Sequence, residues 1–152
     1  MKNKIEILKS IRKIYKKSVD KTDSVFSYLT NWAFRDITNS KPVKYVSEEA
    51  LKMAKQKGIN LSKMNYKDLK KIDPNKEWLY YEHFNTVKDL RLAILNTNES
   101  IEKIVNRAMI CWITREEQAR LDKKYKDHRE DCFACFKEMN IKVLENKGDL
   151  YV

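Results

Sequence analysis

The chain has 152 residues, of which 42% are hydrophobic and 36% are charged, and its formal net charge is +10 at pH 7. The apolar content excludes a disordered chain, no apolar run approaches the roughly 18 residues of a membrane span, and the first residues lack the pattern of a secretory signal. Three cysteines, an odd number, fit a reducing compartment better than a disulfide framework. We therefore expect a cytoplasmic single domain over residues 1–152, without membrane association.

Helical periodicity dominates the first half of the chain. In the opening segment, apolar residues recur at helical spacing and basic residues fall on the opposite side, which predicts a helix with one apolar and one cationic face. After a break at residues 20–23 a second helix is predicted, and we expect its apolar positions to lie in the core: Val25, Phe26, Leu29, Trp32 and Ala33. A third helix is expected between a cap at Ser47 and Gly58, followed by a helical turn at residues 66–71.

The character of the sequence changes after residue 75. The runs "EWLYYEHF" (77–84) and "MICWI" (109–113) are aromatic or β-branched and too short for helices, so they predict two strands, with two helices between them. Thr114 and Glu117 predict a capping box that starts the next helix. A last helix near residues 130–139 and an alternating segment at 141–145 close the chain. The predicted fold class is mostly helical α+β, with a small two- or three-stranded antiparallel sheet.

The positive charge is concentrated in the first half of the chain. Residues 1–75 hold 18 Lys and Arg against 8 Asp and Glu, a net charge of +10, whereas residues 76–152 hold 14 of each, a net charge of zero. A basic helical half beside a charge-balanced half with short strands is typical of a protein that presents one face to a polyanion. Because 16 of the 18 cations are lysines in a chain also rich in isoleucine and asparagine, a composition bias without function is the competing interpretation.

Few residues are available for chemistry. Two glycines in the whole chain exclude the glycine-rich loops of P-loop and Rossmann proteins. The two histidines are His83 and His128, so a general base that works near neutral pH must be one of them, or an acid or lysine with a shifted pKa. Glu82 and His83 stand together at the end of the first predicted strand. The alternative for this pair is a structural role, as a cap or in ion pairing.

An acid and a histidine at a strand end, a helical segment, a second strand and a helix opening "ITREEQARLDKKY" (113–125) follow one another over residues 77–128. This order resembles the HNH, or ββα-metal, nuclease family. The resemblance implies that Glu82 binds a divalent metal such as Mg or Zn, that His83 is the general base, and that the metal stabilises charge on the scissile phosphate. The asparagine and the helix ligand of that family have no clear counterpart here, and Asp122 or Glu116 would have to replace the latter.

A second constellation is "HREDCFACF" (128–136), which holds His128, Cys132 and Cys135. Zinc prefers four thiolate and imidazole ligands, and Cys111 or His83 is available as the fourth. On a helix, however, Cys132 falls on the same apolar stripe as neighbouring hydrophobic residues, and free cysteine is among the most buried residue types. Zinc binding and core packing are therefore the two interpretations of this segment.

Two functions of different classes follow from these patterns. We favour a non-enzymatic protein without cofactors that binds nucleic acid or a nucleoprotein complex; in size and composition it resembles mobile-element inhibitors of nucleic-acid enzymes, such as anti-CRISPR proteins. The alternative is the HNH-like metal-dependent nuclease. The sequence leaves open DNA, RNA or an acidic protein as the partner, and the oligomeric state. The residues assigned to binding are Lys9, Arg12, Lys13, Lys16, Lys17, Lys67, Lys70 and Lys71.

Overall fold

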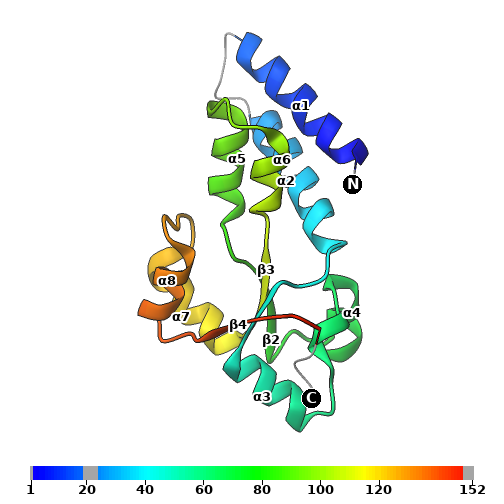
Figure 1. Ribbon diagram of the computed structural model, residues 1–152, viewed down its shortest axis with the longest axis vertical. Coiled ribbons are helices and arrows are strands. Elements are labelled where there is room, and N and C mark those ends of the chain that lie inside the picture. Colours follow the sequence, from blue (N-terminus) through cyan, green and yellow to red (C-terminus); the bar gives the residue numbers. More distant parts are fainter. Residues whose placement is uncertain (1, 19–23, 149–152) are drawn as a thin grey trace.

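The computed structural model describes residues 2–18 and 24–148 and shows an elongated molecule with two parts (Figure 1). One part is a helical bundle made of α1 (Lys2–Lys17), α2 (Ser24–Asn39), α5 (Val87–Asn96) and α6 (Ile101–Asn106). The other is a sheet made of β1 (Tyr45–Ser47), β2 (Leu79–His83), β3 (Ile110–Thr114) and β4 (Val143–Glu145). Around the sheet lie α3 (Glu48–Gln56), a 3-10 turn (Leu61–Lys63), α4 (Tyr66–Ile72), α7 (Arg115–Tyr125) and α8 (Cys132–Glu138).

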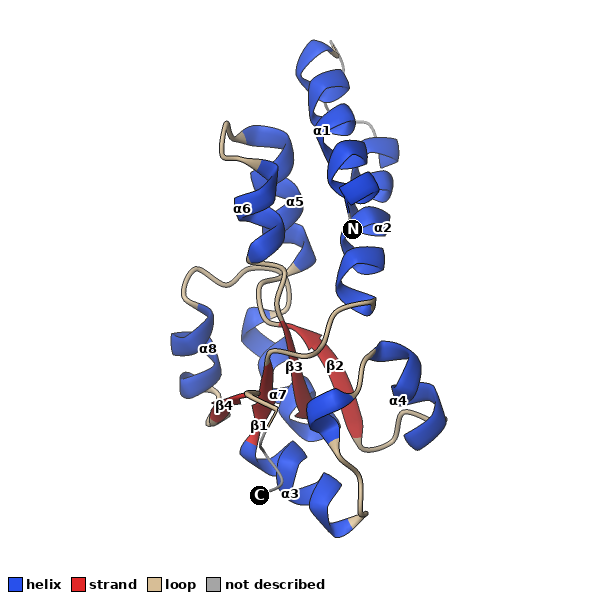
Figure 2. Cartoon of the chain, turned by 45° about the vertical axis from the view of Figure 1, so that its right-hand side comes forward, coloured by secondary structure: helices blue, strands red, loops and turns tan. Residues whose placement is uncertain are grey.

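The sheet has four strands in the order β2-β3-β1-β4 (Figure 2). β2 and β3, the two predicted strands, pair antiparallel with Tyr81 opposite Trp112, whereas β1 runs parallel to β3 and antiparallel to β4. The α+β class is confirmed, but the expected two- or three-stranded antiparallel sheet is wrong, because the sheet is mixed and has four strands. The central strand β1 has three residues, which are all buried, so it shows no alternation that a sequence pattern reveals.

Both faces of the sheet are covered by helices. Successive residues of a strand point to opposite faces. Leu79, Tyr81 and Trp112 therefore join the core under α3 and α4, whereas Phe84 and Ile113 join the core under α7 and α8. Burial on both faces explains why these strands read as nearly continuous apolar and aromatic runs.

The helix starts beside the sheet are fixed by reciprocal caps. The Thr114 hydroxyl accepts a hydrogen bond from the backbone N–H of Glu117 (3.1 Å), and the Glu117 carboxylate accepts one from the backbone N–H of Thr114 (2.8 Å). The predicted capping box is thus confirmed. The hydroxyl of Ser47, which caps α3, donates to the same carboxylate. The Glu117 carboxylate therefore links the N-termini of α3 and α7, the helices that directly follow the parallel strands β1 and β3.

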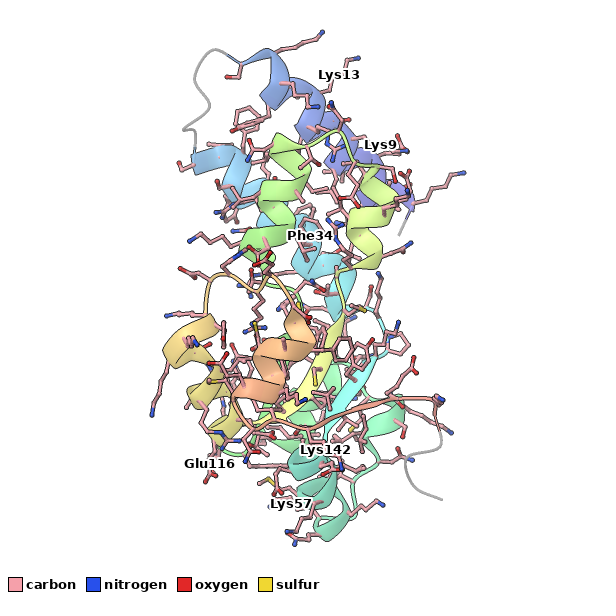
Figure 3. The ribbon with its side chains drawn as sticks, turned by 60° about the vertical axis from the view of Figure 1, so that its left-hand side comes forward. Lys9, Lys13, Phe34, Lys57, Glu116 and Lys142 are labelled. Atoms are coloured by element: carbon pink, nitrogen blue, oxygen red, sulfur yellow. The ribbon has the colours of Figure 1, made fainter. Side chains whose placement is uncertain are left out.

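The bundle has its own core, in which Phe34 lies between the helices (Figure 3). Of the α2 residues expected in this core, Ala33 is buried and Phe26 is partly buried. The prediction is wrong for Val25, Leu29 and Trp32, which are 55%, 38% and 43% exposed. Apolar residues occupy two sides of α2, and helical periodicity alone does not determine which side faces the other helices.

The basic first half of the chain contributes to both parts of the molecule. It supplies α1 and α2 to the bundle, and β1, α3 and α4 to the sheet part. The charge asymmetry of the sequence is therefore not a division between the two structural parts. Within the described residues, no helix is long and apolar enough to cross a membrane.

Candidate functional site

A cleft of about 670 Å³ lies beside β2, where the bundle meets the sheet part. Residues of α2, α4, β2, the start of α5 and α7 line it, together with Lys76 ahead of β2 and Asp127 after α7. β2 is an edge strand, so no further strand covers its outer side. The cleft thus follows a sheet edge that the rest of the described chain leaves accessible.

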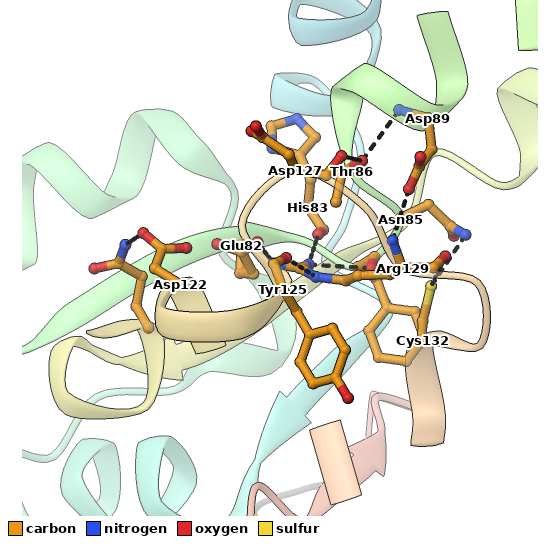
Figure 4. A network of polar contacts seen from close by, with 12 residues as sticks. Glu82, His83, Asn85, Thr86, Asp89, Asp122, Tyr125, Asp127, Arg129 and Cys132 are labelled. Carbon is orange, nitrogen blue, oxygen red and sulfur yellow. Dashed lines mark hydrogen bonds and ion pairs between the residues drawn. The ribbon is translucent and has the colours of Figure 1, made fainter. Parts of the chain in front are cut away.

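Glu82 and His83 both line this cleft, but their side chains leave β2 on opposite faces (Figure 4). The Glu82 carboxylate accepts a hydrogen bond from Nη2 of Arg129, which lies between α7 and α8 (2.7 Å). His83 Nε2 is 3.2 Å from the hydroxyl of Thr38 on α2. The two residues are neighbours at one cleft, and each is bonded to a different part of the fold.

Arg129 holds the end of β2 in place. Its side chain is 1% exposed, and Nη1 donates to the carbonyls of His83 (2.6 Å) and Phe84 (3.2 Å), while Nε donates to the carbonyl of Tyr125 (3.0 Å). The role of this residue was not predicted from the sequence. A single arginine in an acidic segment carries no periodic or motif signal that marks it as buried.

Burial and neighbouring charges set the protonation of both predicted catalytic residues. Burial raises the pKa of Glu82, and the ion pair with Arg129 opposes that rise. A metal ion at this carboxylate would lie close to the Arg129 guanidinium and be repelled by it. Burial, aided by Arg35 and Arg129, lowers the pKa of His83 to about 4. The imidazole is therefore neutral at pH 7 and a weak base.

Cations outnumber carboxylates in the cleft. Six Lys and Arg side chains and three Asp and Glu side chains line it, a difference of +3. Lys88 pairs with Asp127 (3.2 Å), and Arg115 lies 4.6 Å from the centre of the Tyr80 ring. The side chains of the other four make no hydrogen bond or ion pair with any residue that the structure describes; they are Arg35 on α2, Lys76 ahead of β2, Arg91 on α5 and Lys126 just after α7. These side chains are available to an anionic ligand.

The predicted basic residues of α1 are largely engaged with the rest of the bundle. Arg12 donates to the carbonyls of Ile94 near the end of α5 (2.6 Å) and of Glu99 in the loop before α6 (2.5 Å), and burial lowers its pKa. Lys9 pairs with Glu102 on α6 (2.7 Å), and Lys16 donates to Asn98. Lys13 and Lys17 are exposed without a partner in the described chain, and Figure 3 shows Lys13 pointing away from the bundle.

The predicted basic residues of α4 are exposed beside the cleft. Tyr66 and Leu69 of this short helix line the cleft, while Lys67, Lys70 and Lys71 extend into solvent. Lys71 lies 3.6 Å from Asp68, and this exposed pair contributes little to stability. The α4 lysines therefore extend the cationic surface of the cleft.

The three predicted zinc ligands, His128, Cys132 and Cys135, differ in their surroundings. His128 Nδ1 lies 2.6 Å from Asp89 at the start of α5, whereas Cys132 and Cys135 are 7% and 6% exposed, and Cys132 packs into the core under α8. Burial raises the pKa of Cys132 to about 11, so the thiol keeps its proton at neutral pH. Within residues 2–18 and 24–148, no three His, Cys, Asp or Glu side chains are grouped so that they could hold a metal ion.

The chain matches no known protein family, no curated protein and no solved structure. Its β2, β3 and α7 do follow the order of the HNH resemblance, since two antiparallel strands are followed by a helix, with α5 and α6 inserted between the strands. Asp122 of α7 lines the cleft, whereas Glu116 points outward (Figure 3). The resemblance of residues 77–128 to HNH nucleases stays a prediction.

Proposed function

We propose that the protein binds nucleic acid in the cleft beside β2 without cleaving it. The observation that supports this most directly is the convergence of Arg35, Arg91 and Lys126, from three separate helices, on one cleft where no described carboxylate pairs with them. Guanidinium groups bind phosphate oxygens through two parallel hydrogen bonds, and a half-enclosed site strengthens such contacts. An extended anion is the ligand that fits this arrangement.

Further features favour a single strand over a small anion. Tyr66 and Tyr80 line the cleft, and aromatic rings provide stacking surfaces for unpaired bases. The volume of about 670 Å³ is in the range of ligand pockets and suits a short stretch of strand. The exposed Lys67 and Lys70 on α4 would meet the phosphates that continue beyond the cleft. The ligand we propose is therefore a single-stranded segment of DNA or RNA.

The test compares two double variants with equal changes in net charge. Arg35→Glu/Arg91→Glu changes the cleft, and Lys13→Glu/Lys17→Glu changes the exposed side of α1, each by −4. Fluorescence anisotropy with labelled single-stranded DNA, RNA and matched duplexes measures affinity at several salt concentrations. We expect the cleft variant to bind single strands at least about tenfold more weakly, with a shallower salt dependence, and the α1 variant to lose less than about threefold.

Equal losses in both variants would show that only the overall charge matters, and a wild-type protein that binds none of the oligonucleotides would refute the proposal. Circular dichroism of each variant shows whether it has kept the fold. Lys67→Glu/Lys70→Glu is expected to give an intermediate loss, because these lysines flank the cleft.

The second candidate function is metal-dependent cleavage of the bound strand, which the presence of both Glu82 and His83 in the cleft favours. Incubation of the labelled strand with Mg²⁺, Mn²⁺ or Zn²⁺, with EDTA as the control, tests it. Cleavage that His83→Ala abolishes without loss of affinity would establish the nuclease. Binding without product under all three metals supports the non-catalytic function.

A further inference from the structure

The outer face of α1 and α2 is apolar and exposed. Within the described residues, eight large hydrophobic side chains are exposed, and two of them, Leu92 and Phe133, lie on α5 and α8. Single exposed apolar residues are ordinary on soluble proteins, whereas a cluster marks a binding surface. The other six form what we call the α1–α2 face, and all belong to these two helices: Ile7, Ile14, Val25, Tyr28, Leu29 and Trp32.

The contacts between the two helices place these residues along a common seam. The ammonium group of Lys4 lies 3.1 Å from the Asp36 carboxylate and 3.8 Å from the centre of the Trp32 ring, and the rings of Tyr15 and Phe26 meet at 5.4 Å. The start of α1 thus lies beside the end of α2, and the end of α1 beside the start of α2. The two helices are antiparallel neighbours.

Helical spacing then aligns the exposed residues on both sides of this seam. Ile7 and Ile14 are two turns apart and share one side of α1. Lys9, Arg12 and Lys16 mark the flank of α1 that faces α5 and α6. Ile7 and Ile14 lie on the other flank, toward α2, where the exposed residues of α2 recur at intervals of three and four. The six side chains therefore form one continuous surface.

The area of this surface suits a pair of identical faces. Its side chains are 36% to 70% exposed. An aromatic side chain offers about 150–250 Å² and an aliphatic one somewhat less, so the α1–α2 face presents on the order of 500 Å². Two such faces bury roughly 1,000 Å² before any polar rim is added, which is about the minimum area of a biological interface.

The charge of this surface also suits contact with itself. None of the six side chains is charged, and beside Trp32 the ammonium group of Lys4 is paired with the Asp36 carboxylate. A twofold pairing brings the same patch of each copy together, so a charged patch would repel itself whereas a neutral one does not. An acidic partner would find no cation within the face to pair with.

We propose that the α1–α2 face binds a second copy of this chain, so that the protein forms a twofold dimer. The pairing would cover Tyr28 and Trp32, the two aromatic side chains that the bundle leaves exposed, and aromatic residues are typical of interface centres. This inference does not depend on the proposed nucleic-acid binding.

Sedimentation velocity of the full chain, from about 1 to 200 µM, tests the dimer. We expect the wild type to dimerise as concentration rises, and the double variants Ile14→Lys/Tyr28→Lys and Ile14→Glu/Tyr28→Glu to sediment as monomers, since each places like charges against each other. An equimolar mixture of the two variants should regain the dimer, because lysines then face glutamates. Leu92→Lys is the matched control and should dimerise like the wild type, since Leu92 lies outside the face.

Three results would overturn the inference. They are a wild type that stays monomeric throughout, charged variants that still dimerise, and a mixture that stays monomeric although both variants retain their helical content by circular dichroism. Flotation with vesicles containing phosphatidylserine provides the remaining arm, because a monomer that binds these vesicles through the α1–α2 face assigns the surface to a membrane and not to a second copy.

Discussion

The basic residues of α1 and those of the cleft beside β2 differ in what they contact. On α1 they are close in sequence, but Lys9, Arg12 and Lys16 are bonded to α5, α6 or the loop that joins them. In the cleft, Arg35, Arg91 and Lys126 span more than ninety residues of sequence and have no partner among the described residues. The density of charge along a sequence therefore does not measure the charge that a folded protein presents to a ligand.

The largest effect is expected from Arg129→Ala. Arg129 is a buried cation whose hydrogen bonds stabilise the fold beside the cleft, whereas the free cations of the cleft face solvent. The substitution leaves the Glu82 carboxylate and the carbonyls of His83 and Phe84 without their donor. We expect the free energy of unfolding to fall by about 3–5 kcal/mol in urea titrations. Lys126→Ala, the matched free cation, should stay within about 0.5 kcal/mol of wild type.

A loss below about 1 kcal/mol in Arg129→Ala would remove the distinction between cations that hold the fold and cations that face a ligand. Glu82→Gln/Arg129→Met removes both charges, and we expect it to be more stable than Arg129→Ala alone, because no unpaired charge is then buried.

A smaller effect is expected from the pH dependence of His83. Its pKa in the folded state is lowered to about 4, below the ordinary value of 6.5, so between these pH values the unfolded chain binds more protons. The stability that the neutral His83 imidazole contributes is fully present above about pH 6.5. It is lost as the pH drops towards 4, by at most about 3 kcal/mol. Denaturation at a series of pH values should show this slope, and His83→Gln should flatten it.

The cleft cations supply the control for that measurement. Arg35 lowers the pKa of His83, so Arg35→Gln should raise the pKa that NMR titration reports for His83. His128 should behave in the opposite way, because the hydrogen bond to Asp89 raises its pKa and the stability it contributes is lost as pH rises through that value. A pKa of His83 that stays near 6.5 would contradict its position at the base of the cleft.

The smallest effects concern two adjacent residues of α1. Arg12→Ala should lower the free energy of unfolding by about 2 kcal/mol, since the guanidinium donates to carbonyls of α5 and of the loop after it, and these then lose their donor. Lys13→Ala should change it by less than about 0.5 kcal/mol, because Lys13 is exposed. Urea denaturation of both variants measures the difference. Equal losses of unfolding free energy would show that the contacts of Arg12 do not distinguish it from the exposed Lys13.

Local patterns predicted the elements that local interactions build. The strands β2 and β3 and the capping box at Thr114 were predicted because aromatic runs and cap chemistry act over a few residues. The three-residue β1 was missed, and three exposed residues of α2, namely Val25, Leu29 and Trp32, were assigned to the core. Both depend on distant partners, since β1 is a strand only because β3 and β4 flank it.

The candidate site was predicted in the same partial way. Glu82 and His83 were recognisable as a pair, and both line the cleft. Arg129 and the free cations Arg35 and Arg91 were not, because packing of α2, α5 and the segment after α7 brings them to β2 from distant positions. A single sequence holds no pattern that predicts which distant residues come together at β2.

The chain passes between the two parts of the molecule repeatedly. It leaves the bundle after α2, builds β1, α3, α4 and β2, returns for α5 and α6, and leaves again to form β3. The parallel pair of β1 and β3 joins Tyr45 to Cys111, so a loop of 66 residues (111 − 45) must close before the sheet is complete. A nascent chain that ends near residue 75 lacks α5 and α6 of the bundle and β2, β3 and β4 of the sheet, so the second half of the sequence decides when both parts become stable.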